Sequence, residues 1–299
     1  MTCCVAALCD KGKSLVLVSD KMVGMGMIES EPEINKVLWL QNNWRVMVAG
    51  DDISPAFPIV DAAKKRLARK RNLTVDRVMA EVYKSYCDER SAEAECCHLA
   101  PTGWTIKRFN SPASKIIPEA YREEISLKLQ NHRLYVTLIV AGIDDRGKGH
   151  IFSISDGDHR ARPSRHDIPG FYSIGSGAEA AMYMMSYREA SLSMPLRLVL
   201  YYALEGKYFG ERAGGVGTRT DVLVLRANKK PFKIKEKTLD DKLFDLCDKL
   251  KPRDLKGYHV DILNSLGGSY FSTIGKLLRT KEDGEWVIKG EGTEFSKQA

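Results

Sequence analysis

The sequence has no run of 18 or more apolar residues, and its start lacks the basic, apolar, small-residue order of a secretory signal. The first absence argues against a membrane-spanning helix and the second against export, so we expect a cytoplasmic protein with no membrane partner. Repeats and low-complexity tracts are also absent, which argues against a repeat protein. The 299 residues, 43% of them hydrophobic, can bury one large core or two ordinary ones.

Cysteine appears in no metal-binding or disulfide pattern. The seven cysteines are an odd number, include two adjacent pairs and form no CxxC pair. The segment Cys96-Cys97-His98 has no second pair with which to share a metal. We therefore expect reduced thiols, no metal and no cofactor.

Positive charge exceeds negative charge, with a formal net charge of +7, and much of the excess lies in residues 64–71 and 229–237. No aromatic residues alternate with the cations of 64–71, whereas apolar residues precede and accompany them at helical spacing. This pattern favours a solvated helix face, and we do not expect nucleic-acid binding.

The elements predicted along the chain alternate between groups of strands and pairs of helices. Apolar runs such as Leu15 to Val18 are continuous, which indicates a sheet that is covered on both faces. The predicted strands are 3–9, 14–20, 34–40, 44–50, 134–142, 150–155, 171–174 and 221–226. Helices are predicted after a Ser54-Pro55 cap, after Thr74, and over 178–191 and 195–207.

This order predicts an α+β fold, a four-layer αββα sandwich in which two mainly antiparallel sheets stack and helices cover both outer faces. The body would span residues 1–226. It would carry an insertion over 93–131, with a short helix near 121–129. A basic C-terminal extension over 227–299 would contain a helix at 239–250.

The chain begins Met1-Thr2, and a threonine exposed at a chain start carries both a nucleophile and a base. Methionine-removing enzymes accept a small second residue such as threonine. The freed α-amino group has an unperturbed pKa of about 7.7–8.0, so it can take the proton of the adjacent hydroxyl near neutral pH.

Several segments occur in an order that is typical of one family. Asp20 ends a strand, Lys36 stands in Glu33-Ile34-Asn35-Lys36-Val37, and Ala49-Gly50 ends another strand. The segments Ile139 to Asp144 and Ser173-Ile174-Gly175-Ser176-Gly177-Ala178 follow. The chain resembles the β-type subunits of proteasomes and their HslV- and Anbu-like relatives, which are threonine peptidases with the Ntn-hydrolase fold.

The resemblance implies a role for each of these residues. Thr2 would be the nucleophile, and the Lys36 ammonium, oriented by Asp20, would favour its alkoxide form. The Gly50 amide would be the oxyanion donor. Ser176 would orient the amino group of Thr2. Considered singly, Asp20 and Lys36 could be a surface ion pair, Gly50 a turn residue, and Ser176 a helix cap.

Two features depart from the family pattern. Two additional residues lie between Thr2 and Asp20, so an ungapped alignment places Cys4 at the nucleophile position. The turn 10–14 can hold the extra residues at little cost, which favours Thr2 and leaves Cys4 as the alternative. In addition, Gly210 and Ala213 stand where relatives have Asp and Ser, and Glu211 lies one place away.

By the same alignment, a mostly apolar pocket would bind the side chain that precedes the cleaved bond. This pocket predicts a preference for small or medium apolar side chains before the cleaved bond, with basic ones accepted if Asp52 points inward. The residues that line it would be Val23, Ile34, Leu38, Val48 and Ala56, with Asp52 at its floor or rim.

The resemblance implies a proteasome-like threonine endopeptidase that cleaves polypeptides inside a homo-oligomeric ring or related assembly. It leaves open an ATP-dependent unfoldase as a further partner. Two alternatives stay open at this point: a catalytically silent scaffold subunit with the same fold, and an Ntn amidase that acts on small amides.

Overall fold

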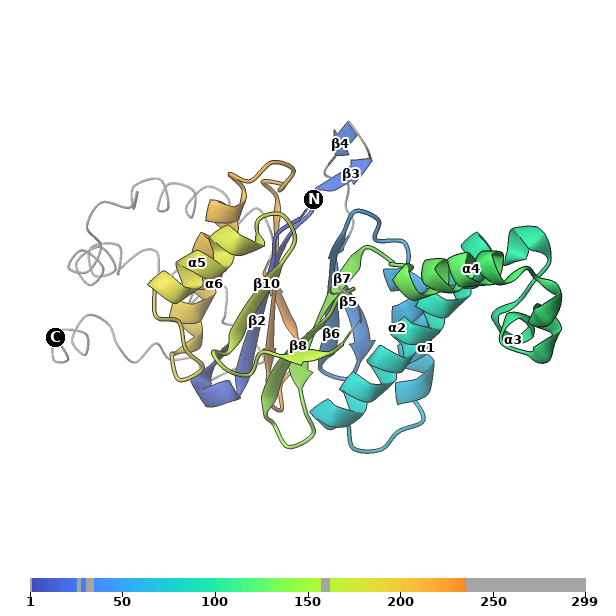
Figure 1. Ribbon diagram of the computed structural model, residues 1–299. Coiled ribbons are helices and arrows are strands. Elements are labelled where there is room, and N and C mark those ends of the chain that lie inside the picture. Colours follow the sequence, from blue (N-terminus) through green and yellow to red (C-terminus); the bar gives the residue numbers. More distant parts are fainter. Residues whose placement is uncertain (1, 26–27, 31–34, 157–161, 235–299) are drawn as a thin grey trace, which may run out of the picture. The chain divides into compact units, whose positions relative to one another are not determined.

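The computed structural model describes residues 2–25, 28–30, 35–156 and 162–234. Two five-stranded, mainly antiparallel sheets stack face to face, and helices cover the outer face of each (Figure 1). The predicted α+β four-layer αββα sandwich is confirmed. Within the part that the structure describes, no helix is both long and apolar enough to span a bilayer.

The first sheet has the strand order β10-β1-β2-β11-β12. Its third and first strands match the predicted bounds of 14–20 and 171–174. Helices α5 (Ala178–Tyr187) and α6 (Leu196–Gly210) contact its outer face. The strands are β1 (Cys4–Cys9), β2 (Ser14–Asp20), β10 (Phe171–Ile174), β11 (Thr220–Arg226) and β12 (Phe232–Ile234).

The second sheet has the order β5-β6-β7-β8-β9, and helices α1 (Ala56–Leu67) and α2 (Val75–His98) contact its outer face. A separate hairpin joins β3 (Val23–Met25) to β4 (Ile28–Ser30). It was not predicted, because glycines interrupt the strand pattern there. The strands of the second sheet are β5 (Val37–Gln41), β6 (Trp44–Gly50), β7 (Val136–Ile143), β8 (Gly149–Ile154) and β9 (Ser164–Arg165).

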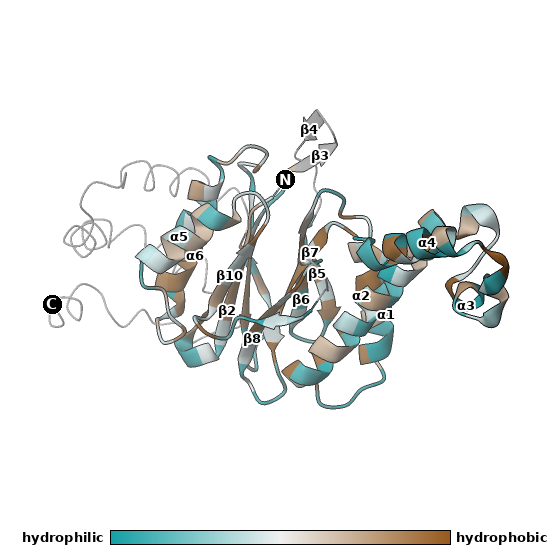
Figure 2. Cartoon of the chain, in the orientation of Figure 1, coloured by the Kyte–Doolittle hydropathy of each residue, from teal (hydrophilic) through white to brown (hydrophobic). Residues whose placement is uncertain are grey.

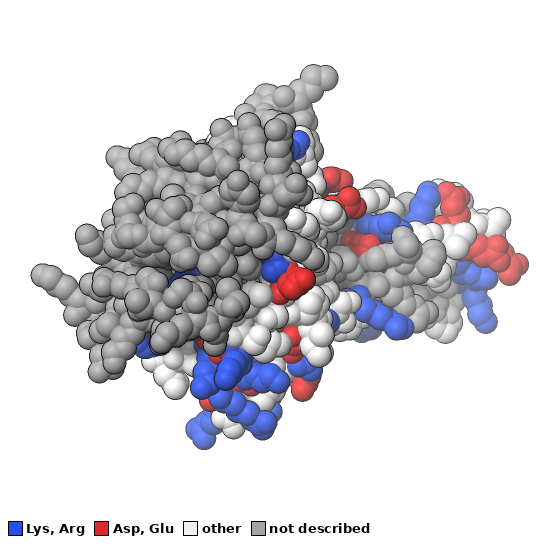
Figure 3. Space-filling model, turned by 90° about the vertical axis from the view of Figure 1, so that its left-hand side faces the viewer, with Lys and Arg blue, Asp and Glu red and all other residues white. Residues whose placement is uncertain are grey.

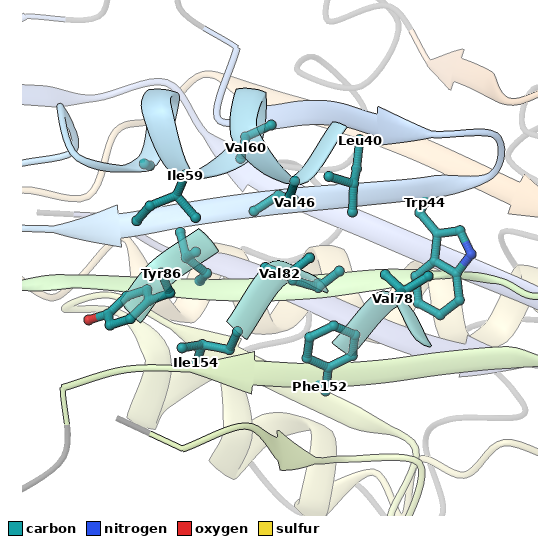
Figure 4. Close-up of a cluster of buried hydrophobic side chains, with 14 of the residues drawn as sticks. Leu40, Trp44, Val46, Ile59, Val60, Val78, Val82, Tyr86, Phe152 and Ile154 are labelled. Atoms are coloured by element: carbon teal, nitrogen blue, oxygen red, sulfur yellow. The ribbon is translucent and has the colours of Figure 1, made fainter. Parts of the chain in front are cut away.

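Alternation along the strands divides their side chains between two cores. Val46 and Val48 of β6 pack in the cluster beneath α1 and α2, part of which Figure 4 shows, whereas Met47 and Ala49 pack against the first sheet. Hydrophobic colours are frequent in the stacked sheets, whereas helices α1, α2 and α4 contain many hydrophilic residues (Figure 2). The continuous apolar runs reflect burial on both faces of each sheet.

The region of the predicted insertion forms a small helical lobe beside α2 (Figure 1). The prediction placed its start at residue 93, but α2 continues to His98. Apolar periodicity fades there because this part of α2 contacts α4 (Glu119–Asn131), and the Arg90 guanidinium donates to the carbonyls of Gln130 and His132. The lobe has its own core of Leu99, Phe109 and Ile125. It also contains η2 (Ala100–Thr102), α3 (Ile106–Phe109) and η3 (Pro112–Ile116).

Two local predictions are wrong. Strand β5 begins at Val37 rather than at residue 34, because the Asn35 side chain accepts the Val37 amide at 2.9 Å and forms a turn. Ser54 does not cap α1, which has Pro55 at its N-cap and no side-chain cap bond. Instead the Ser54 amide donates to Asp52 Oδ1 at 2.8 Å.

The chain divides into two compact units, Met1–Lys233 and Ile234–Ala299. The predicted helix at 239–250 and most of the predicted extension lie outside the described residues. In α1, Ile59, Val60, Ala63 and Leu67 are buried, and Arg66 pairs with Asp88 of α2. Further Lys and Arg side chains gather at the lower end of the face in Figure 3.

Candidate active site

Thr2 lies directly before β1, and only 3% of its surface is exposed. The Lys36 ammonium donates to its hydroxyl oxygen, and its own backbone amide donates to Ser176 Oγ at 3.3 Å. The hydroxyl and the backbone nitrogen of Thr2 therefore each have a polar partner from a distant part of the sequence.

Lys36, which contacts the Thr2 hydroxyl, is also buried and is 3% exposed. Its Nζ donates to both carboxylate oxygens of Asp20, at 2.9 Å to Oδ1 and 3.0 Å to Oδ2. An ammonium has three N–H donors, and the hydroxyl of Thr2 with the two oxygens of Asp20 gives it three acceptors.

Asp20 is 0% exposed, and backbone amides complete its coordination. Oδ1 accepts from Cys3 at 3.0 Å, and Oδ2 accepts from Met22 at 2.9 Å and from Gly217 at 3.1 Å. The alternative of an exposed ion pair is therefore wrong. A buried carboxylate requires such partners because desolvating an unpaired charge is costly.

The backbone of Thr2 is held by the segment that follows β10. The Gly177 amide donates to the Thr2 carbonyl at 3.1 Å. Gly175 has a φ of +97°, and a Cβ at this position would lie 2.1 Å from that carbonyl oxygen. Only glycine fits there, because any side chain would meet both a strained backbone and a clash.

Ser176 lies between these two glycines and does not cap α5. The N-cap of α5 is Gly177, which makes no side-chain cap bond. The Ser176 hydroxyl accepts from the Thr2 amide and lies 3.4 Å from the Gly214 carbonyl oxygen, to which it donates. The structure thus joins Ser176 to Thr2 and to the loop after α6.

Gly50 ends β6, next to the position of Lys36. The Val48 amide donates to the Lys36 carbonyl at 3.2 Å, which brings this end of β6 beside the site. A Cβ on Gly50 would lie 2.3 Å from the carbonyl oxygen of Tyr135. Glycine at this position therefore also has a packing reason, and its role as oxyanion donor stays a prediction.

Cys4, the alternative nucleophile, lies inside the sheet and is 0% exposed. It pairs with Ile174 of β10 on one side and with Ser19 of β2 on the other. Its thiol donates to the Val48 carbonyl at 3.8 Å. Burial, and next the negative charge of Asp20, raise the pKa of Cys4 well above its usual value, so its thiol stays protonated.

Thiol alkylation tests this difference between the cysteines. Burial is the main cause that raises the pKa of Cys3 to about 12, and Cys4 is also buried, whereas Cys96 and Cys97 are exposed. We expect iodoacetamide near pH 7.5 to label Cys96 and Cys97 in the folded protein and to spare Cys3 and Cys4, as measured by peptide mass mapping. Rapid labelling of Cys4 would contradict its placement inside the sheet.

The structure places the predicted pocket residues in different surroundings. Val48 and Ala56 are buried in the cluster beneath α1, and Leu38 packs against it. Asp52 is exposed, and its hydrogen bonds with Ser54 lower the pKa of its carboxyl. Val23 lies in β3, and Ile34 lies outside the described residues.

The two positions at which the sequence resemblance leads one to expect Asp and Ser are Gly210 and Ala213. Gly210 ends α6, and a Cβ on it would lie 2.8 Å from the Cys3 sulfur. The Glu211 carboxylate pairs with the Lys207 ammonium.

Among the described residues there is no group of three or more His, Cys, Asp and Glu that could hold a metal ion.

Several groups that build the site were not predicted from the sequence. The amides of Cys3, Met22 and Gly217 bind Asp20, and the Gly214 carbonyl binds Ser176. Backbone groups are present in every residue, so a sequence carries no signal for them. After α6 the sequence has Gly214, Gly215 and Gly217, whose lack of side chains permits a close backbone approach.

No protein-family model and no curated protein matches the chain. Among solved structures, a Gly-1 mutant of Anbu from Hyphomicrobium sp. strain MC1 matches it with a TM-score of 0.55 and 16% sequence identity. The match covers 83% of this chain and 92% of that chain. The chain therefore has the fold of this Anbu structure, and the resemblance in fold that the sequence predicts is confirmed.

Proposed function

We propose that this protein is a threonine-type endopeptidase whose nucleophile is Thr2, exposed by removal of Met1. One observation carries the proposal: the Thr2 hydroxyl accepts from Lys36, which is itself paired with the buried carboxylate of Asp20. A buried lysine aimed at the hydroxyl of the second residue has no evident purpose in a helix cap or a turn. It fits the stabilisation of a developing alkoxide.

In the first step, Thr2 Oγ1 attacks the carbonyl carbon of a peptide bond. Its proton passes to the free α-amino group, directly or through a water, and then to the leaving amine as the carbon–nitrogen bond breaks. The product is an ester between Thr2 and the acyl part of the substrate. The Thr2 nitrogen already lies 3.3 Å from Ser176 Oγ, so the freed amine would be oriented by that hydroxyl.

In the second step, water cleaves the ester. The α-amino group takes a proton from the water, the hydroxide adds to the ester carbonyl, and the proton returns to Thr2 Oγ1 as the acid product leaves. The Gly50 amide would stabilise the oxyanion in both steps, a class of contact whose loss costs about 2.7–4 kcal/mol elsewhere. The Lys36 side chain lies next to the Thr2 oxygen in both steps.

Thr2 is a better candidate than Cys4 because freeing the α-amine of Thr2 removes only Met1, whereas freeing that of Cys4 also removes Cys3. Loss of Met1 alone leaves the Cys3 amide bound to Asp20 at 3.0 Å. Freeing the amine of Cys4 would remove Cys3 and therefore one of the anchors of Asp20. The turn between β1 and β2, where Asp10, Lys11 and Gly12 all have positive φ, contains enough chain for the two additional residues.

Polypeptides are the proposed substrates, in a homo-oligomeric ring or related assembly like those of the family that the sequence resembles. An ATP-dependent unfoldase would be a further partner of such an assembly. Small or medium apolar side chains would precede the cleaved bond. Because the Asp52 carboxylate accepts a hydrogen bond from the Ser54 amide, we expect peptides with a basic side chain before the cleaved bond to be poor substrates. A panel of fluorogenic peptides in which acidic residues are preferred would contradict this pocket.

Intact-mass spectrometry of the purified chain tests the proposal. We expect loss of Met1 and, after treatment with an epoxyketone or a β-lactone, a single adduct that peptide mapping places on Thr2. Retention of Met1 in material that hydrolyses peptides would contradict the mechanism. Loss of Met1 without adduct or hydrolysis would instead favour a silent scaffold subunit, and turnover of small amides but not of unfolded polypeptides would favour an amidase.

A further inference from the structure

A buried lysine on α6 lies behind the candidate site. Lys207 is 1% exposed, and its Nζ donates to the Thr218 carbonyl at 2.9 Å and to the Thr220 hydroxyl at 2.8 Å. Its third acceptor is the Glu211 carboxylate, one helical turn further along the chain. The ammonium therefore connects the end of α6 with the start of β11.

The segment between these anchors reaches the site at two points. The Gly217 amide donates to Asp20 Oδ2 at 3.1 Å, and the Gly214 carbonyl accepts from Ser176 Oγ at 3.4 Å. Thr220, to which Lys207 donates, is the partner of Asp20 in the register of β11 and β2. Lys207 is thus linked through the backbone of this segment to the carboxylate that orients Lys36 and to the hydroxyl beside the Thr2 nitrogen.

The segment needs an external anchor because its own sequence gives it little stiffness. It contains Gly214, Gly215 and Gly217, and Gly215 has a φ of +77°. Glycines lose more conformational entropy on ordering than other residues. A buried ammonium with three acceptors supplies strong, directional bonds that hold such a segment in one conformation.

We propose that Lys207 and Glu211 are positioning residues that fix the segment 212–219 against Asp20 and Ser176. This rests on the proposed threonine-peptidase function. The pair would replace the Asp and Ser that the family resemblance leads one to expect at Gly210 and Ala213. A Cβ on Gly210 would lie 2.8 Å from the Cys3 sulfur, which disfavours a side chain at this position. The acidic residue therefore stands one place later, at Glu211.

The experiment compares three variants of the full chain. Lys207→Met removes the ammonium and leaves the Glu211 carboxylate, whose side chain is 10% exposed, without this partner, which can impair folding. Lys207→Met/Glu211→Leu removes both charges and keeps the protein testable. Arg188→Met/Glu205→Leu is the matched control, because this ion pair is also buried and also uses α6, but its hydrogen bonds join Arg188, Glu205 and Tyr201.

Two quantities are measured in each variant: amide hydrogen exchange in peptides that span 212–219, and kcat and KM for a fluorogenic peptide. We expect exchange at least about 10-fold faster in both Lys207 variants, and kcat lower by about 10- to 100-fold with KM changed by less than about 3-fold, because the reacting groups are misplaced rather than the substrate pocket. The control should keep slow exchange in this segment and its kcat.

Unchanged exchange in both Lys207 variants would overturn the proposal. Faster exchange with unchanged kcat would also overturn it, since the segment would then have no role in positioning the site. The exchange measurement does not depend on Thr2 chemistry. Failure of the peptidase proposal is detected separately, by full activity of a Thr2→Ala variant, and exchange alone then decides whether Lys207 holds the segment.

Discussion

Replacement of Thr2 by alanine is expected to lower peptide hydrolysis by at least about 10³-fold while the protein stays folded. The substitution removes the hydroxyl oxygen that would form the acyl ester, and it leaves the amine, Lys36, Asp20 and Ser176 in place. Thr2 belongs to neither hydrophobic cluster of the two sheets, so the main cost to the free energy of unfolding is the acceptor that the buried Lys36 ammonium loses, about 1–3 kcal/mol. Turnover and a thermal melt, measured on the same preparation, check both parts.

Two companion variants make this result specific. Thr2→Ser retains a hydroxyl and an α-amine and should keep measurable hydrolysis and adduct formation. Cys4→Ala removes the alternative nucleophile and should keep full hydrolysis per folded molecule, with some loss of stability because the thiol is buried. If Thr2→Ala stays active and Cys4→Ala is inactive, the chemistry belongs to Cys4.

Replacement of Asp20 by alanine is expected to destabilise the protein by about 3–5 kcal/mol and to abolish hydrolysis, because one partner of a buried ion pair is lost. Lys36 would keep only the Thr2 hydroxyl among its three acceptors. The amides of Cys3, Met22 and Gly217 would lose their acceptor inside the protein, which adds a desolvation cost. Urea unfolding curves and peptide hydrolysis measure the two effects.

A matched control uses an ion pair that resembles Asp20–Lys36 only in its charges. Asp61 pairs with Lys64 on α1 at 3.2 Å, and the Asp61 side chain is 63% exposed. Asp61→Ala should therefore change stability by less than about 1 kcal/mol and leave hydrolysis unchanged. Equal effects of the two substitutions would show that burial and the amide contacts contribute nothing to Asp20.

The fold could be predicted well because the spacing of apolar residues along the chain differs between strands and helices. Leu15 to Val18 are apolar without a break because both faces of β2 are buried, and the structure has β2 at the predicted bounds. Boundaries were less predictable where a side chain competes with the regular pattern. Asn35 accepts the Val37 amide, so β5 starts later than predicted, and α2, whose Arg90 binds the end of α4, continues past residue 93, where the insertion was predicted to start.

The sequence by itself determined the strand and helix order and the side chains Thr2, Asp20, Lys36 and Ser176, since these chemical groups are specified by residue type. Only the tertiary structure decided that the four meet, that Asp20 is buried and that Cys4 lies inside the sheet. Contacts such as Thr2 with Ser176 or Asp20 with Gly217 join residues far apart in the chain. They depend on sheet register and on backbone amides, which local sequence patterns do not encode.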